Sequence, residues 1–355
     1  MGRFFSSEKD TKFTGQNPEL HRPAEREKKE SAETKPVSAE TCVERLDSVL
    51  RKKEYQHWES KEAQEENRRQ IVDYDHKKRE VQRASLETQR SILTRYGDRF
   101  DQENMQRMHS EIGSNKIEIY NEPYFVTEKV PDISKPVKVL GMRDFPDGKI
   151  CIRDGEDLAK LKHVSTHETM HDLSYQHSDH NTKTVQDTLT GQLRTVSKTE
   201  LSSGIHRVET TRQIVDGKPV GDAKDIHYNR YLNEGITELY TIEEMQRRGE
   251  QPDFASYTQE VGWVLNLRDK VGDDLIADAY FGGNLEALRQ KVNDMSDISD
   301  AWDNLSLSID EYNRALEIYS NTGDLHYKNR AEQYKQAADY IIDSLQGSRV
   351  LVKRR

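Results

Sequence analysis

The chain of 355 residues is 33% hydrophobic and 33% charged, so part of it is not expected to pack tightly, and its formal net charge is −10. This acidic balance argues against nucleic acid as the main partner, because phosphate binding needs a basic face. No apolar run is long enough for a membrane span and the N-terminus lacks an apolar signal stretch. We therefore expect no membrane span, and a protein that is cytoplasmic or exported without a Sec-type signal peptide.

The first 112 residues divide by composition into an arm and a helical segment. Residues 1–37 are rich in Glu, Lys, Ser, Thr and Pro, which predicts a disordered arm. In residues 38–112 apolar positions recur at helical spacing, and Thr41 with Glu44 matches a capping box. This pattern predicts a helical hairpin or coiled segment, which serves either as a solvated spacer or for self-association.

Residues 113–295 have the pattern of a folded α+β domain. Short apolar runs predict three strands, over 116–120, 137–140 and 149–153. The last two flank the turn signal Pro146-Asp147-Gly148 and should form a hairpin. A helix that begins near Asp154 follows directly after this hairpin.

The rest of the chain is predicted to be mostly helical after one extended insertion. Residues 190–222 alternate short apolar runs with turn residues, which predicts an inserted β-hairpin. A helix from about 225 to 248 should end at Gly249. Further helices are predicted over 257–271, 273–280 and 285–294, with a pair in the C-terminal helical segment 296–347 before a basic tail at 348–355. The fold class expected from these elements is α+β, mostly helical, with a small antiparallel sheet.

The helix near Asp154 carries the sequence His167-Glu168-Thr169-Met170-His171. Positions i and i+4 lie on one face of a helix, so His167 and His171 can direct two imidazoles at one metal ion. Glu168 is rotated by one residue, which places its carboxylate beside the metal, where a general base would take a proton from water. The motif therefore predicts a catalytic zinc site.

A catalytic zinc ion needs a third protein ligand, and Asn233-Glu234-Gly235-Ile236-Thr237-Glu238 lies on the next predicted helix. The two motifs together resemble the gluzincin metallopeptidases, whose N-E-x-x-[ST]-[DE] helix supplies a glutamate ligand and a carboxylate four residues later. The resemblance covers about residues 137–295 and implies a zincin-like fold, a zinc ion and peptide-bond hydrolysis. It also implies that Glu234 is the third ligand and that Glu238 hydrogen-bonds a ligating histidine, His167.

A competing third ligand lies directly after the motif. His177 follows His171 at the spacing of the metzincin pattern H-x-x-G-x-x-H, except that Ser174 stands where that pattern has glycine. The glycine allows a sharp break with positive φ, which is costly for serine. If the helix instead continued, His177 would point away from the metal. His180 is a further alternative ligand.

A tyrosine or histidine donor usually assists the metal in stabilising the developing oxyanion, and Tyr228 is the candidate preferred here. The sequence thus predicts a zinc-dependent endopeptidase that acts on a protein or peptide substrate, with Glu168 and Tyr228 as its catalytic residues. Two alternatives stay open. One is a delivered bacterial effector or toxin protease, and the other is a helical scaffold in which the metal site is structural.

Overall fold

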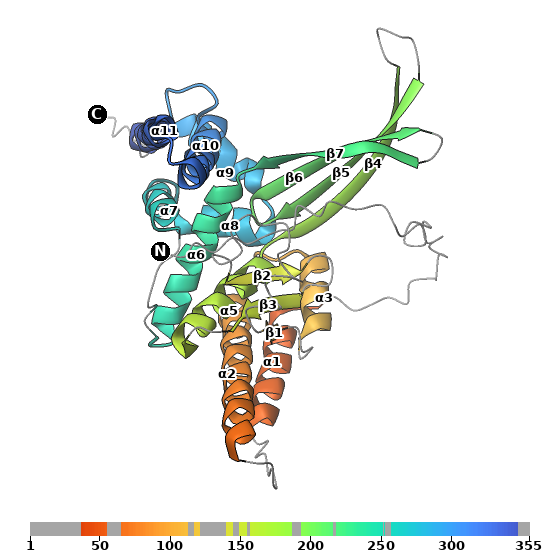
Figure 1. Ribbon diagram of the computed structural model, residues 1–355, viewed down its shortest axis with the longest axis vertical. Helices are drawn as coiled ribbons and strands as arrows, with labels where there is room; N and C mark the ends of the chain where they lie inside the picture. The colour runs from red at the N-terminus through yellow and green to blue at the C-terminus, as the bar shows by residue number, and fades with distance from the viewer. Residues whose placement is uncertain are drawn as a thin grey trace, which may run out of the picture. The chain divides into compact units, whose positions relative to one another are not determined.

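The computed structural model describes residues 37–54, 65–112, 117–120, 140–144, 149–154, 157–186, 193–215, 218–250, 252 and 257–346 (Figure 1). The predicted arm before residue 37 and the basic tail lie outside these residues. The contacts group the chain into two compact units, and their boundary falls inside one helix, α5 (Leu158–Leu173), between Glu168 and Thr169. Each unit is described by itself.

The first unit begins with three helices, α1 (Ala39–Glu54), α2 (Glu65–Tyr96) and α3 (Gln102–Glu111). The predicted hairpin is present as α1 and α2, which pack together. The third helix, α3, adds to it, and its Met105 contacts Cys42 of α1 in the buried core. The capping box at Thr41 is wrong: α1 already begins at Ala39, because the hydroxyl of Ser38 accepts a hydrogen bond from the Thr41 amide at 3.3 Å.

A three-stranded sheet follows, formed by β1 (Ile117–Tyr120), β2 (Gly141–Asp144) and β3 (Lys149–Arg153) in the order β1-β3-β2. The predicted hairpin of β2 and β3 is antiparallel, but β1 pairs with β3 in parallel, so this sheet is mixed. The middle strand of the prediction was placed too early, since β2 begins at Gly141 and only Leu140 of the predicted run is described.

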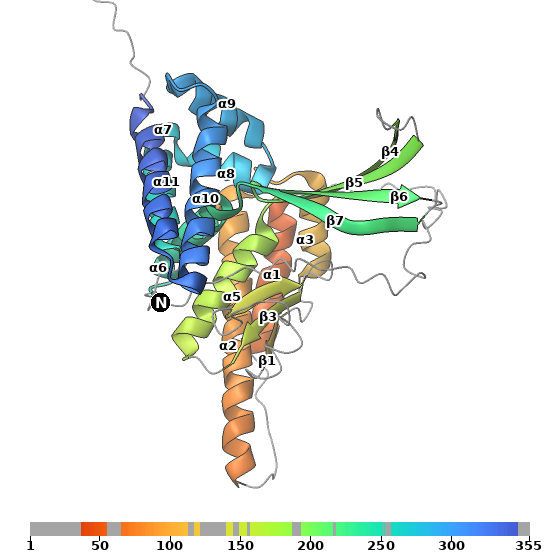
Figure 2. The ribbon, with the colours of Figure 1, turned by 45° about the horizontal axis from the view of Figure 1, so that its top comes forward.

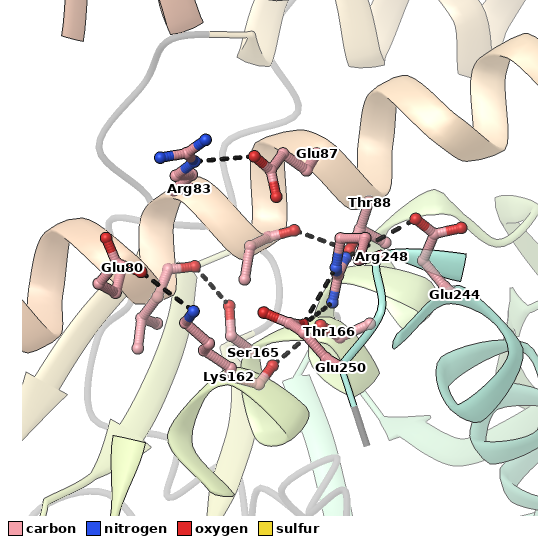
Figure 3. Close-up of polar contacts among 12 residues, drawn as sticks. Glu80, Arg83, Glu87, Thr88, Lys162, Ser165, Thr166, Glu244, Arg248 and Glu250 are labelled. Atoms are coloured by element: carbon pink, nitrogen blue, oxygen red, sulfur yellow. Dashed lines mark hydrogen bonds and ion pairs between the residues drawn. The ribbon is translucent and has the colours of Figure 1, made fainter. Parts of the chain in front are cut away.

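Helix α5 packs on α2 within this unit (Figure 3). Its start is capped by Asp157, whose carboxylate accepts a hydrogen bond from the Lys160 amide at 2.8 Å. The hydroxyl of Ser165 donates to the Val81 carbonyl of α2 at 3.0 Å, and the Lys162 amine pairs with the Glu80 carboxylate at 3.0 Å. These bonds hold the half of α5 that precedes the unit boundary.

The second unit contains a four-stranded antiparallel sheet that is larger than the predicted hairpin. Its strands are β4 (Gln176–Gln186), β5 (Leu193–Ser203), β6 (His206–Val215) and β7 (Lys218–Tyr228), paired in chain order. One end of the sheet lies beside helices of the same unit, and its other end extends away from them (Figures 1 and 2). The prediction missed β4 completely, and it placed residues 225–228 on a helix although they end β7.

In its described part the second unit is completed by six helices: α6 (Arg230–Arg247), α7 (Thr258–Val271), α8 (Asp273–Gly282), α9 (Leu285–Met295), α10 (Ala301–Thr322) and α11 (Leu325–Ser344). The helices predicted from residue 257 onward are confirmed to within a few residues. Their shared core contains the largest fully buried side chains of this unit, namely Trp263, Trp302, Tyr240, Tyr280 and Phe281. Near the end of α6 the Arg248 guanidinium lies between the carboxylates of Glu244 and Glu250 (Figure 3).

The described residues therefore form an α+β protein that is mostly helical, as predicted. None of the helices in this part of the chain combines the length with the apolar character that a bilayer crossing needs.

Candidate metal centre

The two motif histidines lie on one continuous helix. His167 and Glu168 are fully buried, and His171 is 5% exposed, one turn further along α5. Although the unit boundary falls between Glu168 and Thr169, the helix runs through it unbroken. The i, i+4 spacing therefore places both imidazoles on one face of α5.

Helix α6 supplies the carboxylate. The Glu234 Oε2 atom lies 3.3 Å from His171 Nε2, and both side chains are buried. Ligand atoms of His167, His171 and Glu234 all lie within 4.8 Å of one another, which makes this the one such group found among the described residues. A buried carboxylate oxygen and a ring nitrogen at this distance are stabilised either by a proton on the imidazole or by a cation that both bind.

The donor set fits a zinc ion. Two imidazole nitrogens and one carboxylate oxygen are a common ligand set of catalytic zinc sites, in which three protein ligands leave one position open. The burial of the three side chains also suits an ion, because a buried carboxylate needs a positive partner.

Glu168 lies against strand β2. A Cβ atom at Gly141 would lie 2.4 Å from Val164 Cγ1 and 3.1 Å from Glu168 Oε1. Only glycine leaves room for this approach, so Gly141 lets the backbone of β2 pass directly beside the carboxylate. Because β2 is an edge strand of its sheet among the described residues, Glu168 lies beside an edge strand.

Thr237 links His171 to Tyr280. The Thr237 hydroxyl donates to the Asn233 carbonyl at 2.9 Å, so its oxygen is left to accept from the Tyr280 hydroxyl at 2.7 Å and from His171 Nδ1 at 3.5 Å. This arrangement assigns the imidazole proton of neutral His171 to Nδ1, and it leaves the Nε2 lone pair facing Glu234. The sequence did not identify Thr237 or Tyr280 as site residues, because both lie far from His171 along the chain.

The start of α6 is fixed to the sheet by two asparagines. The Asn233 side chain accepts from the Ile205 amide at 3.0 Å, and the Asn229 side chain donates to the Ile205 carbonyl at 3.1 Å. Gly204 has φ +59, and a Cβ atom there would lie 2.4 Å from the Asn233 side-chain oxygen. The turn between β5 and β6 therefore positions the helix that carries Glu234.

Two buried groups near α6 have perturbed acidities. Burial and the negative charge of Glu234 raise the pKa of Tyr257 well above its ordinary value, so this phenol keeps its proton. Burial raises the pKa of Asp310 to about 6, although the carboxylate accepts a hydrogen bond from the Tyr231 amide at 3.1 Å. Tyr257 is thus a neutral phenol whose pKa is raised by the nearby charge of Glu234, and the sequence did not identify it.

The structure places the competing ligands away from this group. Helix α5 ends at Leu173 without a positive φ at Ser174, and the Ser174 hydroxyl and the side-chain Nε2 of Gln176 both donate to the His171 carbonyl. His177 is exposed on β4, and His180 lies 3.0 Å from the Thr199 hydroxyl on the same sheet. The group formed with His167 contains neither of them.

The two remaining predicted residues have different outcomes. Glu238 is fully buried one turn after Glu234, while its proposed bond to His167 stays a prediction. Tyr228 is wrong as a helix residue: it ends β7, is 36% exposed and carries the Arg207 guanidinium 4.7 Å from its ring centre. Its catalytic role stays a prediction.

No family model, curated protein or solved structure matches the chain. The candidate site therefore stands on its own residues and geometry.

Proposed function

We propose that this protein is a zinc-dependent peptidase with a gluzincin-type, zincin-like catalytic centre. The observation that carries the proposal is the buried group of His167, His171 and Glu234, with Glu168 beside it on the same helix as the histidines. When bound, a zinc ion would supply Lewis acidity and would lower the pKa of a water molecule.

The chain's own residues have distinct tasks in this proposal. His167, His171 and Glu234 hold the ion, and the hydroxyl of Thr237 keeps the His171 ring in the tautomer that ligates through Nε2. Glu168 accepts a proton from the attacking water and later delivers it to the leaving amine.

The proposed substrate is an extended peptide segment. Among the described strands β2 is paired on one side only, and Gly141 brings its backbone within contact distance of Glu168. Main-chain hydrogen bonds along such an edge hold a peptide as an added strand and carry its scissile carbonyl past the base. This mode of binding is tolerant of sequence, so we propose an endopeptidase that acts on unfolded or loop segments of proteins.

The sharpest test is Glu168→Gln, which preserves shape but removes the base. We expect the variant to retain one zinc ion per chain by elemental analysis and to lose cleavage of denatured casein by at least about a hundredfold. Undiminished cleavage by Glu168→Gln would refute this role for Glu168. Equal rates of cleavage by the zinc-free and the zinc-loaded chain would refute the role of the metal.

The ligand assignment has its own matched pair. Glu234→Ala should lose zinc, whereas His177→Ala should keep it, because His177 is exposed on β4. The opposite result would transfer the third ligand to His177. Stoichiometric zinc in a wild-type chain that cleaves nothing would instead favour a structural metal site.

A further inference from the structure

Among the described strands, β4 is paired on one side only. It pairs with β5 through an unbroken ladder from Gln176 to Gln186, and no described strand lies on its other side. Side chains from His177 to Thr184 are exposed on both faces of the sheet. An edge strand of this length, about 36 Å, offers a row of backbone donors and acceptors for another strand.

The opposite edge of the same sheet is protected and β4 is not. Strand β7 contains Pro219, which has no amide hydrogen, and Gly221 with φ +74, and its ladder with β6 is irregular between Thr211 and Gln213. Proline and irregularities of this kind are the features that prevent edge pairing. Strand β4 has neither Pro nor Gly and no register shift, so its edge is suited to pairing.

The charges of β4 are complementary to those of a second β4. Asp179 and Lys183 lie two residues before and two residues after Asn181, on one face of the strand. In an antiparallel pair centred on Asn181, each Asp179 faces Lys183 of the other copy, and His180 faces Thr182. A pair centred on Asp179 or on Lys183 would instead place like charges opposite each other.

The neighbouring strand strengthens this preference. Within the sheet Asp179 lies opposite Glu200 of β5, a like-charge pair that is unfavourable. The guanidinium of Arg207 lies 3.8 Å from Glu200 and 2.7 Å from Glu209, so it serves two carboxylates already. Lys183 of a second copy, across the edge of β4, would place a cation beside Asp179 and offset its repulsion from Glu200.

We propose that two copies of this chain associate through antiparallel pairing of their β4 strands about Asn181. The two four-stranded sheets then form one continuous sheet of eight strands. A single strand pair buries little surface, so the dimer forms at micromolar concentration and dissociates on dilution. This proposal does not depend on the peptidase activity.

Charge exchange tests the register directly. Asp179→Lys and Lys183→Asp each place like charges across the two-fold axis, and each should weaken self-association by about tenfold or more in analytical ultracentrifugation. An equimolar mixture of the two variants restores opposite charges at both contacts. It should therefore associate as tightly as the wild type, as should the double variant with both charges exchanged.

A cross-linking experiment checks the centre of the pairing. Asn181→Cys places two cysteines opposite each other at the two-fold axis, where the Cα separation of about 5 Å suits a disulfide. Thr182→Cys is the matched control, since its copies lie too far apart to bridge. The native Cys42 and Cys151 are buried and should not interfere.

Three results would overturn the proposal. One is a wild-type chain that stays monomeric from about 1 to 100 μM, the range in which weak interfaces form. Another is a dimer that neither charge variant weakens, which would place the interface elsewhere, as on the N-terminal helices. The third is equal cross-linking at positions 181 and 182. Unchanged circular dichroism of the exposed-site variants separates loss of association from loss of folding.

Discussion

Replacing Thr237 by valine should weaken zinc binding without removing a ligand. Valine keeps the branched shape but can neither accept from His171 Nδ1 nor bond the Tyr280 hydroxyl. The imidazole then loses the partner that fixes its tautomer and orientation. Changes at such partners of metal ligands typically cost 10- to 100-fold in affinity, or about 1.4 to 2.7 kcal/mol.

The same substitution should lower the stability of the metal-free protein. The Tyr280 hydroxyl is fully buried, and losing a partner for a buried polar group costs about 1 to 3 kcal/mol. Zinc affinity is measured by competition with a chromophoric chelator, and the free energy of unfolding by urea titration of the metal-free chain. The two readouts separate the effect on the ion from the effect on the fold.

Thr241→Val is the matched control for Thr237→Val. Thr241 is also fully buried, lies one turn later on α6 and donates its hydroxyl to the Thr237 carbonyl at 2.8 Å. Its loss should destabilise the chain by about 1 kcal/mol and leave zinc affinity unchanged. Thr237→Ser, which retains the hydroxyl, should bind zinc like the wild type. Equal zinc affinities in both valine variants would refute the positioning role.

Two further predictions concern packing and pH. Gly141→Ala should destabilise the chain by about 1 to 3 kcal/mol in urea titration, because the new Cβ would meet Val164, whereas Gly262→Ala on α7 meets nothing within 4 Å and should stabilise it by up to about 1 kcal/mol. The raised pKa of Asp310, from 3.8 to about 6, means that the folded chain binds a proton more tightly than the unfolded one. The free energy of unfolding of the wild type should therefore fall relative to that of Asp310→Asn as pH rises from 4 to 7, by up to about 3 kcal/mol. Parallel pH dependences of unfolding free energy for the two chains would contradict this.

The sequence predicted the helices well where helical periodicity and stop signals coincide. The predicted stop Gly249 follows α6 with positive φ, and the helices from residue 257 onward match the prediction. The motif residues were also found from spacing alone, because His167 and His171 need only one continuous helix to share a face. Their role as zinc ligands stays a prediction.

The sequence could not predict β4 or the residues that support His171. Strand β4 is exposed on both faces, so it has no alternation of polar and apolar residues for a periodicity argument to detect. Thr237 contacts Tyr280 and His171 only through tertiary packing. The start of α6 was misplaced because residues 225–228 have no breaker before the left-handed Asn229.

The four-stranded sheet explains how Glu234 reaches a histidine that lies far before it in the chain. The chain leaves the end of α5 through β4, and an even number of antiparallel strands returns it to the same end of the sheet. There Asn229 and Asn233 bind the turn between β5 and β6 and start the helix that carries Glu234. The site therefore needs the half of the sheet that contains the turn between β5 and β6. It does not need the other half, which extends away from the helices of this unit.

Shortening both hairpins tests this account. Replacing residues 182–197 and 212–223 each by Asn-Gly joins the paired residues Asn181 with Lys198 and Thr211 with Lys224 through two-residue turns. The shortened chain should bind zinc with wild-type affinity, because every contact described at the metal centre is kept. It should lose self-association, because it lacks Lys183. Loss of zinc binding in a folded, shortened chain would show that the far half of the sheet contributes to the site.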